Sequence, residues 1–186
     1  MGRKKLVRAA GLCGILGVAI VYPLILLAIF YYPSFSWFNN ALSDLGVGVS
    51  APIFNTALLI GGALLLIFSL GLLNYTSGYI AKLGSLLLIA ASIFLAAIGL
   101  FPENYGKLHF YVSVAFFVLI VFSLLTLGLS LILQSSRASG FLTVVGAIIA
   151  ALIWIFPWTG VAIPETIASI ILSARVVSFA YKMLVK

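Results

Sequence analysis

Charged residues are scarce in this sequence. Asp, Glu, Lys and Arg together make up 7% of its 186 residues, whereas 65% are hydrophobic and the mean hydropathy is +1.34. Soluble globular domains are roughly a quarter charged and nearer half apolar, and disordered chains are poorer still in apolar residues. The composition therefore excludes both classes and indicates a protein whose solvent is lipid.

Several chemical signatures are also missing. The single cysteine, Cys13, has no second cysteine with which to form an internal disulfide. The sequence contains no His-Glu-x-x-His, no Gly-x-Ser-x-Gly and no glycine-rich phosphate-binding loop. The net charge of +7 comes from Lys and Arg at the ends of apolar segments instead of along one face. No nucleic-acid partner is therefore expected.

What the sequence does have is long apolar runs. A helix needs about 20 mostly apolar residues to cross the hydrocarbon core of a bilayer, and six such segments alternate with short connections. They lie approximately at 9–30, 52–73, 80–101, 108–133, 139–157 and 163–182. The sequence therefore predicts an all-α fold: a single integral membrane domain, residues 1–186, built as a bundle of six transmembrane helices with membrane lipids as its partners.

The basic residues predict the orientation of this bundle. With six spans, both termini share one side of the membrane with the connections at 74–79 and 134–140. That side carries Arg3, Lys4, Lys5, Arg8, Lys82, Arg137, Lys182 and Lys186, whereas the opposite side carries only Lys107. Because cytoplasmic loops are enriched in Lys and Arg, we expect a cell-membrane protein with cytoplasmic N- and C-termini.

All the acidic residues fall on the other, outer side. Each of the three outward hairpins begins its connection with an aromatic residue and a proline, which biases the chain away from helix. The acids are Asp44, Glu103 and Glu165, and the sole histidine, His109, follows the second of them. Ionisable groups near lipid are costly and tend to be functional. We therefore expect these four side chains to form a polar pocket if the hairpin tips converge.

The first outer connection predicts a short helix. Its apolar residues with nearly helical spacing are Trp37, Phe38, Leu42 and Leu45. Asn39 or Asn40 is a suitable N-cap, and Gly46 suits the helix end. One interpretation places this helix in the membrane interface on its aromatic residues. The other places it over the bundle with Asn40, Ser43 and Asp44 pointing inward, where Asp44 in the last turn opposes the helix dipole and needs a cation or the histidine as partner.

Glu103, Glu165 and His109 each have two interpretations. Both glutamates follow a proline, and an acid in the first turn after a proline is a common way to begin a helix. His109 lies near the start of the fourth span, where the helix N-terminus favours a neutral imidazole. Such an imidazole serves as a hydrogen-bonding group, a general base or a metal ligand. If a divalent metal such as zinc is present, its expected ligands are Asp44, Glu103, His109 and Glu165.

These residues leave three functions open. The first is binding of a lipid headgroup, a cation or a small amphiphile in the outer pocket, or a clamp in which the same groups only join the hairpin tips. The second is a membrane-embedded hydrolase or transferase, metal-dependent if a metal binds. Its catalytic groups would be the three acids and His109, with Asn40 and Ser43 as binding groups. The third, a small transporter or channel, lacks an acid near the bilayer centre, where a proton or cation relay needs one.

The NALSDLG run at 40–46 and the FN pair at 54–55 resemble the family known as domain of unknown function 998. The FPE segment at 101–103, His109 and Glu165 are similar to other recurrent positions of that family, and the resemblance covers nearly the whole chain. It implies a prokaryotic six-helix membrane protein, loosely DRAM-like, and it points to the same polar residues. It implies no activity.

Overall fold

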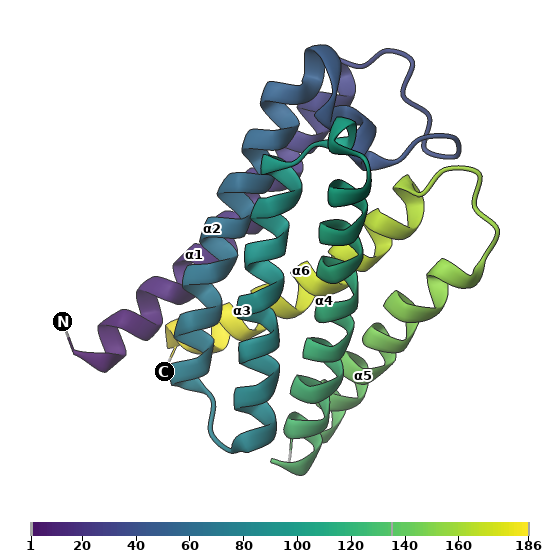
Figure 1. Cartoon of the computed structure of the whole chain (residues 1–186). Coiled ribbons are helices and arrows are strands. Elements are labelled where there is room, and N and C mark those ends of the chain that lie inside the picture. Colours follow the sequence, from purple (N-terminus) through teal and green to yellow (C-terminus); the bar gives the residue numbers. More distant parts are fainter. Residues whose placement is uncertain (1, 135, 186) are drawn as a thin grey trace.

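The computed structural model describes residues 2–134 and 136–185 and is all-α (Figure 1). Six helices are long and apolar enough to cross a membrane, by length and composition. They are α1 (Arg3–Phe30), α2 (Ala51–Tyr75), α3 (Tyr79–Leu100), α4 (Lys107–Leu133), α5 (Arg137–Leu152) and α6 (Ala162–Val185). Within the described residues there is no strand. The predicted all-α bundle of six membrane-spanning helices is confirmed.

The largest differences from the predicted spans are at two helix boundaries. The first helix begins at Arg3 instead of near residue 9, because backbone hydrogen bonding continues from the apolar run into the basic residues before it. The fifth ends at Leu152 and is continued by a short 3₁₀ helix, η4 (Ile153–Ile155), before Pro157. An apolar run marks the part of a helix that lies in lipid, which differs from the part that is helical.

Successive helices from α1 to α5 pack side by side, and α6 returns to pack against α1 more extensively than against α5 (Figure 1). Both termini lie at one end of the bundle together with the α2–α3 and α4–α5 connections. We name this the basic end. The opposite end, with the connections at 31–50, 101–106 and 153–161, holds every acidic residue and is named the acid end.

Helices α4 and α5 approach each other most closely near the basic end. A Cβ atom on Gly140 would lie 2.6 Å from the carbonyl oxygen of Gly128. Only glycine permits this approach, which is how helices associate in lipid without a hydrophobic driving force. From this crossing the two helices diverge toward the acid end (Figure 1).

The first connection at the acid end folds over the bundle and pairs with the third. It contains two 3₁₀ helices, η1 (Leu42–Gly46) and η2 (Gly48–Ser50). The Gly160 N–H donates to the Phe38 carbonyl at 2.8 Å, and the Ala162 N–H donates to the Asn40 carbonyl at 2.9 Å. Leu42, Ser43, Leu45 and Gly46 are buried. Of the two interpretations of this segment, the one in which it covers the bundle is therefore the one that the structure adopts.

The predicted N-cap of this short helix is wrong. The helix begins after Ala41, because the Asn40 side chain is engaged elsewhere: its Oδ1 accepts the Ser36 N–H at 2.9 Å. Asp44 lies in the first turn of η1, and its carboxylate accepts the Ala41 N–H at 3.1 Å. Its position is thus at the helix end where a negative charge is favourable, and the conflict with the helix dipole expected from the sequence does not arise.

Candidate functional site

Three connections bring the three acids together at the acid end. We define Asp44, Glu103 and Glu165 as the acid cluster. Asp44 is supplied by η1, Glu103 by the 3₁₀ helix η3 (Glu103–Tyr105) and Glu165 by the first turn of α6. Glu103 forms a hydrogen bond with Asp44, and Glu165 lies close enough to interact electrostatically with both. The convergence on which the predicted pocket depended is therefore present.

The carboxyl groups of Glu103 and Asp44 interact directly. Two carboxyl groups form a hydrogen bond only when one of them is protonated. The hydrogen bond to Asp44, partial burial and the repulsion from the Asp44 charge raise the pKa of Glu103 to about 7, although the Ser43 hydroxyl partly opposes this shift. Near neutral pH the Glu103 carboxyl group is therefore able to release or take up a proton when its surroundings change.

Glu165 joins α6 to the first connection. Its Oε2 accepts the Leu42 N–H at 2.6 Å, across 123 residues of sequence. The sequence offered two interpretations of this residue, a helix start or a pocket acid. In the structure it begins α6 and also faces the pocket, so the two interpretations hold together.

Asn40 and Ser43 position the cluster. The Asn40 Nδ2 donates to Asp44 Oδ2 at 2.5 Å, and its Oδ1 accepts a backbone N–H from within the same connection. The Ser43 side chain is buried and hydrogen bonds to Glu103. Both residues predicted to support the site therefore contact an acid directly.

His109 lies beside the acids but bonds to other groups. Its Nδ1–H donates to the Phe101 carbonyl at 2.8 Å, and the Ser113 hydroxyl lies 3.3 Å from its Nε2. Because a carbonyl only accepts, the Nδ1 atom carries a hydrogen, and in the neutral ring Nε2 is left as an acceptor. The buried imidazole is thus held in one orientation with its basic nitrogen next to a hydroxyl group.

The described side chains were compared with the arrangement that a metal ion requires. Across residues 2–134 and 136–185, no group of three or more His, Cys, Asp or Glu side chains is arranged to hold a metal ion. The Nδ1–H of His109 donates to a backbone carbonyl, and one carboxylate oxygen of Glu165 accepts a backbone N–H. The geometry gives no support to the metal ligands suggested by the sequence, and we treat the acids as hydrogen-bonding and acid–base groups.

The cluster closes one end of a long groove. A cavity of about 890 Å³ lies where α4 and α5 diverge, and we name it the acid groove. Its polar end contains Ser43, Glu103, His109, Ser113 and Glu165. The rest is apolar and is formed by Val114, Phe117, Val118, Val121, Phe122, Ala150, Ala151 and Trp154, among others. The groove thus has a polar end and a long apolar part, which is the arrangement that complements an amphiphile.

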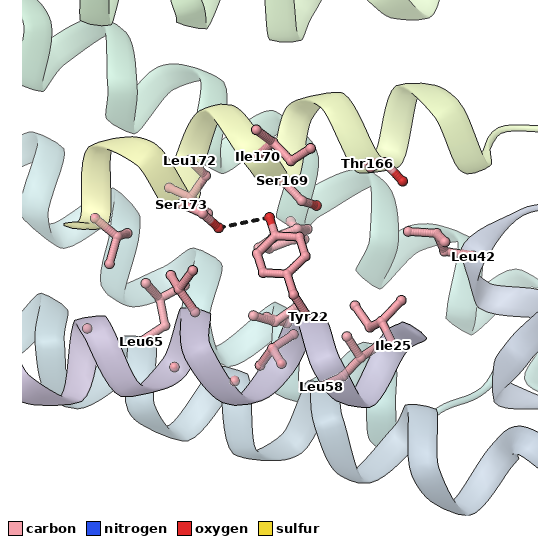
Figure 2. Close-up of a pocket in the computed structure, with 18 of the residues that line it drawn as sticks. Tyr22, Ile25, Leu42, Leu58, Leu65, Thr166, Ser169, Ile170, Leu172 and Ser173 are labelled. Atoms are coloured by element: carbon pink, nitrogen blue, oxygen red, sulfur yellow. Dashed lines mark hydrogen bonds between the residues drawn. The ribbon is translucent and has the colours of Figure 1, made fainter. Parts of the chain in front are cut away.

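A second cavity lies on the other side of α6. It measures about 310 Å³ between α1, α2 and α6, and we name it the tyrosine cavity. Figure 2 shows Tyr22 projecting from α1 toward Ser173 on α6, to which it is hydrogen bonded at 3.0 Å. In η1, Leu42 lines the tyrosine cavity and its neighbour Ser43 lines the acid groove. In α6, Thr166 lines the tyrosine cavity and its neighbour Glu165 lines the acid groove. Helix α4 does the same, because Phe116 lines the tyrosine cavity and Phe117 the acid groove, so α4, α6 and η1 together separate the two cavities.

Three groups at these cavities were absent from the sequence prediction: Ser113, Trp154 and Tyr22. Ser113 had a detectable signal, because it lies one helical turn after His109 and so shares its face. Trp154 and Tyr22 had none, since single aromatic residues within apolar runs are common in membrane helices. Only the packing of distant helices gives these two residues a role.

Comparison with known proteins places the chain in a family but adds no activity. Neither the curated proteins nor the solved structures contain a match to it. The family model described as "Protein of unknown function (DUF998)" matches residues 15–182, which is most of the chain and includes the whole acid cluster. The six helices and the family match together identify an integral membrane protein, and the chain belongs to the DUF998 family.

Proposed function

We propose that the protein binds an amphiphile with a primary-amine headgroup in the acid groove, with the headgroup at the acid cluster and the chain along α4 and α5. The observation that carries this proposal is the position of two glutamates, Glu103 and Glu165, at one end of an otherwise apolar groove, with Asp44 in direct interaction with Glu103. The distribution of basic residues supports a cell-membrane orientation with cytoplasmic termini. The headgroup would then sit at the outer face.

The charge of the polar end favours a cationic headgroup. Among the described residues that line the acid groove there are two glutamates and one histidine, and neither Lys nor Arg. Asp44 does not line the groove, but it interacts directly with Glu103 and adds a third carboxyl group to the site. An ammonium group supplies three N–H donors and one positive charge, which matches these acceptors. A phosphate without an amine would meet repulsion.

The apolar part fits a hydrocarbon chain that enters from the bilayer. From His109 to Phe122 the groove follows α4 for about 20 Å of helix rise, which is most of the thickness of the hydrocarbon core. Several of its side chains are exposed at the protein surface, including Phe110, Val118 and Phe122. The Phe117 and Trp154 rings both line the groove and contact each other at an interplanar angle of 59°, with centroids 4.8 Å apart. A lipid can therefore reach the site laterally without leaving the membrane.

Native mass spectrometry of the full chain tests this proposal. The purified protein would be offered equal amounts of phosphatidylethanolamine and phosphatidylcholine with identical acyl chains, so that only the headgroup amine differs. We expect the ethanolamine lipid to be retained preferentially and the preference to disappear in Glu103→Gln and Asp44→Asn. Lys107→Gln, next to the site but outside the groove lining, is the matched control and should keep the preference. Equal retention of the two lipids by the unmodified protein would overturn the proposal.

A second function, a lipid hydrolase or transferase, is favoured by one observation. The Nε2 of His109 is an acceptor within 3.3 Å of the Ser113 hydroxyl, and both side chains line the groove. A base beside a hydroxyl group is the arrangement needed to activate a nucleophile. Turnover of fluorescent phospholipids in liposomes, abolished in His109→Ala and Ser113→Ala, would support it. Absence of turnover in the unmodified protein would leave binding alone.

A further inference from the structure

The tyrosine cavity is neutral and elongated. Among its described lining residues there is no Asp, Glu, Lys, Arg or His. On α1 the lining extends from Cys13 to Leu26, which is about 20 Å of helix rise. A charged ligand would find no counter-ion here, so the chemistry of the lining selects an uncharged molecule with a long apolar part.

Within residues 2–134 and 136–185, one hydroxyl hydrogen in this cavity has no acceptor. Tyr22 and Ser173 share a single hydrogen bond, which uses one of their two hydroxyl hydrogens. The other hydroxyl groups nearby donate to backbone carbonyls: Ser169 to Glu165 at 2.7 Å and Thr166 to Ala162 at 2.7 Å. In the described part of the chain, the Tyr22–Ser173 pair therefore keeps one hydroxyl hydrogen that is available to donate a hydrogen bond to a ligand.

This donor lies deep in the membrane. Ser173 is near the middle of α6, about 16 Å of rise from Ala162 and about 18 Å from Val185. At that depth there is no water to satisfy a hydroxyl hydrogen, and the ester groups of phospholipids stay at the interface. The acceptor must therefore belong to a lipid whose polar group enters the bilayer interior.

We propose that the tyrosine cavity binds a neutral lipid with a carbonyl oxygen inside the bilayer, the chemistry of an isoprenoid quinone, and that the Tyr22–Ser173 pair donates the hydrogen bond to this oxygen. Figure 2 shows the two hydroxyl groups facing each other across the cavity, with the hydrocarbon side chains of α1 and α6 on either side. The apolar remainder of the cavity holds the chain of the ligand. This site is separate from the acid groove and does not depend on its function.

Fluorescence of Trp37, which lines the tyrosine cavity, provides the test. In Trp154→Phe/Trp158→Phe protein in lipid nanodiscs, Trp37 is the only tryptophan. A decyl-substituted benzoquinone should quench it with a saturable component. Tyr22→Phe, which removes one of the two hydroxyl groups, should weaken this component about tenfold. Tyr111→Phe makes the same chemical change on an exposed residue outside the cavity and should not alter binding.

A second variant keeps the test decisive if the tyrosine change has indirect effects. Ser169→Leu adds volume within the cavity and should abolish the saturable component while leaving the non-saturable quenching from the bilayer. Quenching that is only linear in quinone concentration, as expected if acyl chains alone fill the cavity, would overturn the proposal. So would saturable binding that is equal in the unmodified and Tyr22→Phe backgrounds.

Discussion

The acid groove and the tyrosine cavity lie on opposite sides of α6, yet they differ in every property that selects a ligand. The acid groove is lined by two carboxyl groups at the acid end of the bundle, Glu103 and Glu165, with Asp44 beside Glu103, whereas the tyrosine cavity has neutral hydroxyl groups near the middle of α6. The difference follows from the cost of burying charge, which is tolerable near the interface and severe in the hydrocarbon core. Depth in the membrane therefore determines which chemistry each cavity can offer.

Single elements of the chain form the partition between the two cavities. Adjacent residues of η1 and of α6 face different cavities. The hydrogen bond from Leu42 to Glu165 joins these two elements. Substitutions at the partition should therefore affect both cavities, whereas substitutions elsewhere should affect only one of them.

The largest effect is expected from a substitution that distorts the acid groove and leaves the tyrosine cavity unchanged. In Gly140→Val the new Cβ lies 2.6 Å from the Gly128 carbonyl oxygen and 2.7 Å from the Ile132 nitrogen, both backbone atoms that cannot rotate away. Forcing α4 and α5 apart should cost about 3 kcal/mol and distort the acid groove, as measured by thermal unfolding in detergent. Gly17→Ala, whose Cβ meets only Leu64 at 3.4 Å in the tyrosine cavity, is the control. Equal unfolding temperatures in the two variants would contradict this explanation.

A change at Glu165 tests the partition itself. Glu165→Ala leaves the Leu42 N–H without its acceptor and should cost about 2 kcal/mol, measured by thermal unfolding. Glu165→Gln keeps a carbonyl oxygen in the same place, so it should restore most of the stability while lacking the charge. If the glutamine variant is as unstable as the alanine variant, the hydrogen bond is not what joins α6 to η1.

The pH dependence of stability distinguishes the charged cavity from the neutral one. The pKa of Glu103 is raised from 4.5 to about 7 in the folded protein. Between these values the folded state binds more protons than the unfolded state, so stability should fall as pH rises from about 4.5 to about 7. Glu103→Gln should flatten this slope in thermal unfolding, whereas Lys107→Gln, which leaves the acid cluster intact, should preserve it. A slope that is unchanged in Glu103→Gln would assign the pH effect to another group.

The smallest effect is expected at the tyrosine cavity. Tyr22→Phe removes one hydrogen bond between membrane helices, which contributes about 0.6 kcal/mol on average. Its unfolding temperature should therefore stay close to that of Tyr111→Phe, even though quinone binding is weakened about tenfold. A large loss of stability would show that the Tyr22–Ser173 pair serves mainly to join α1 to α6.

The sequence predicted the helices and the placement of the acids well, for physical reasons. Long apolar runs have one stable form in a bilayer, so six such runs predict six helices. The alternation of sides along the chain then placed Asp44, Glu103 and Glu165 at one end. Their meeting in one cluster depends on backbone hydrogen bonds such as Ala162 to Asn40, which no pattern in the sequence encodes.

The rest of the site depended on contacts between residues far apart in sequence. Tyr22 and Ser173 are separated by 151 residues, and each by itself resembles an ordinary residue of a membrane helix. The acid groove exists because α4 and α5 cross closely at Gly128 and Gly140 and then diverge. Crossing geometry of this kind is set by packing and is not visible in hydropathy.

Single-tryptophan quenching tests the central claim, that the acid groove selects an amine headgroup, most directly. Trp154 reports on the acid groove and Trp37 on the tyrosine cavity, and each would be isolated by replacing the other tryptophans with phenylalanine. Phosphatidylethanolamine with brominated acyl chains should quench Trp154 more than the matching phosphatidylcholine, and Glu103→Gln should remove the difference. Trp37 should show no headgroup preference. Equal quenching of Trp154 by the two lipids would contradict the account.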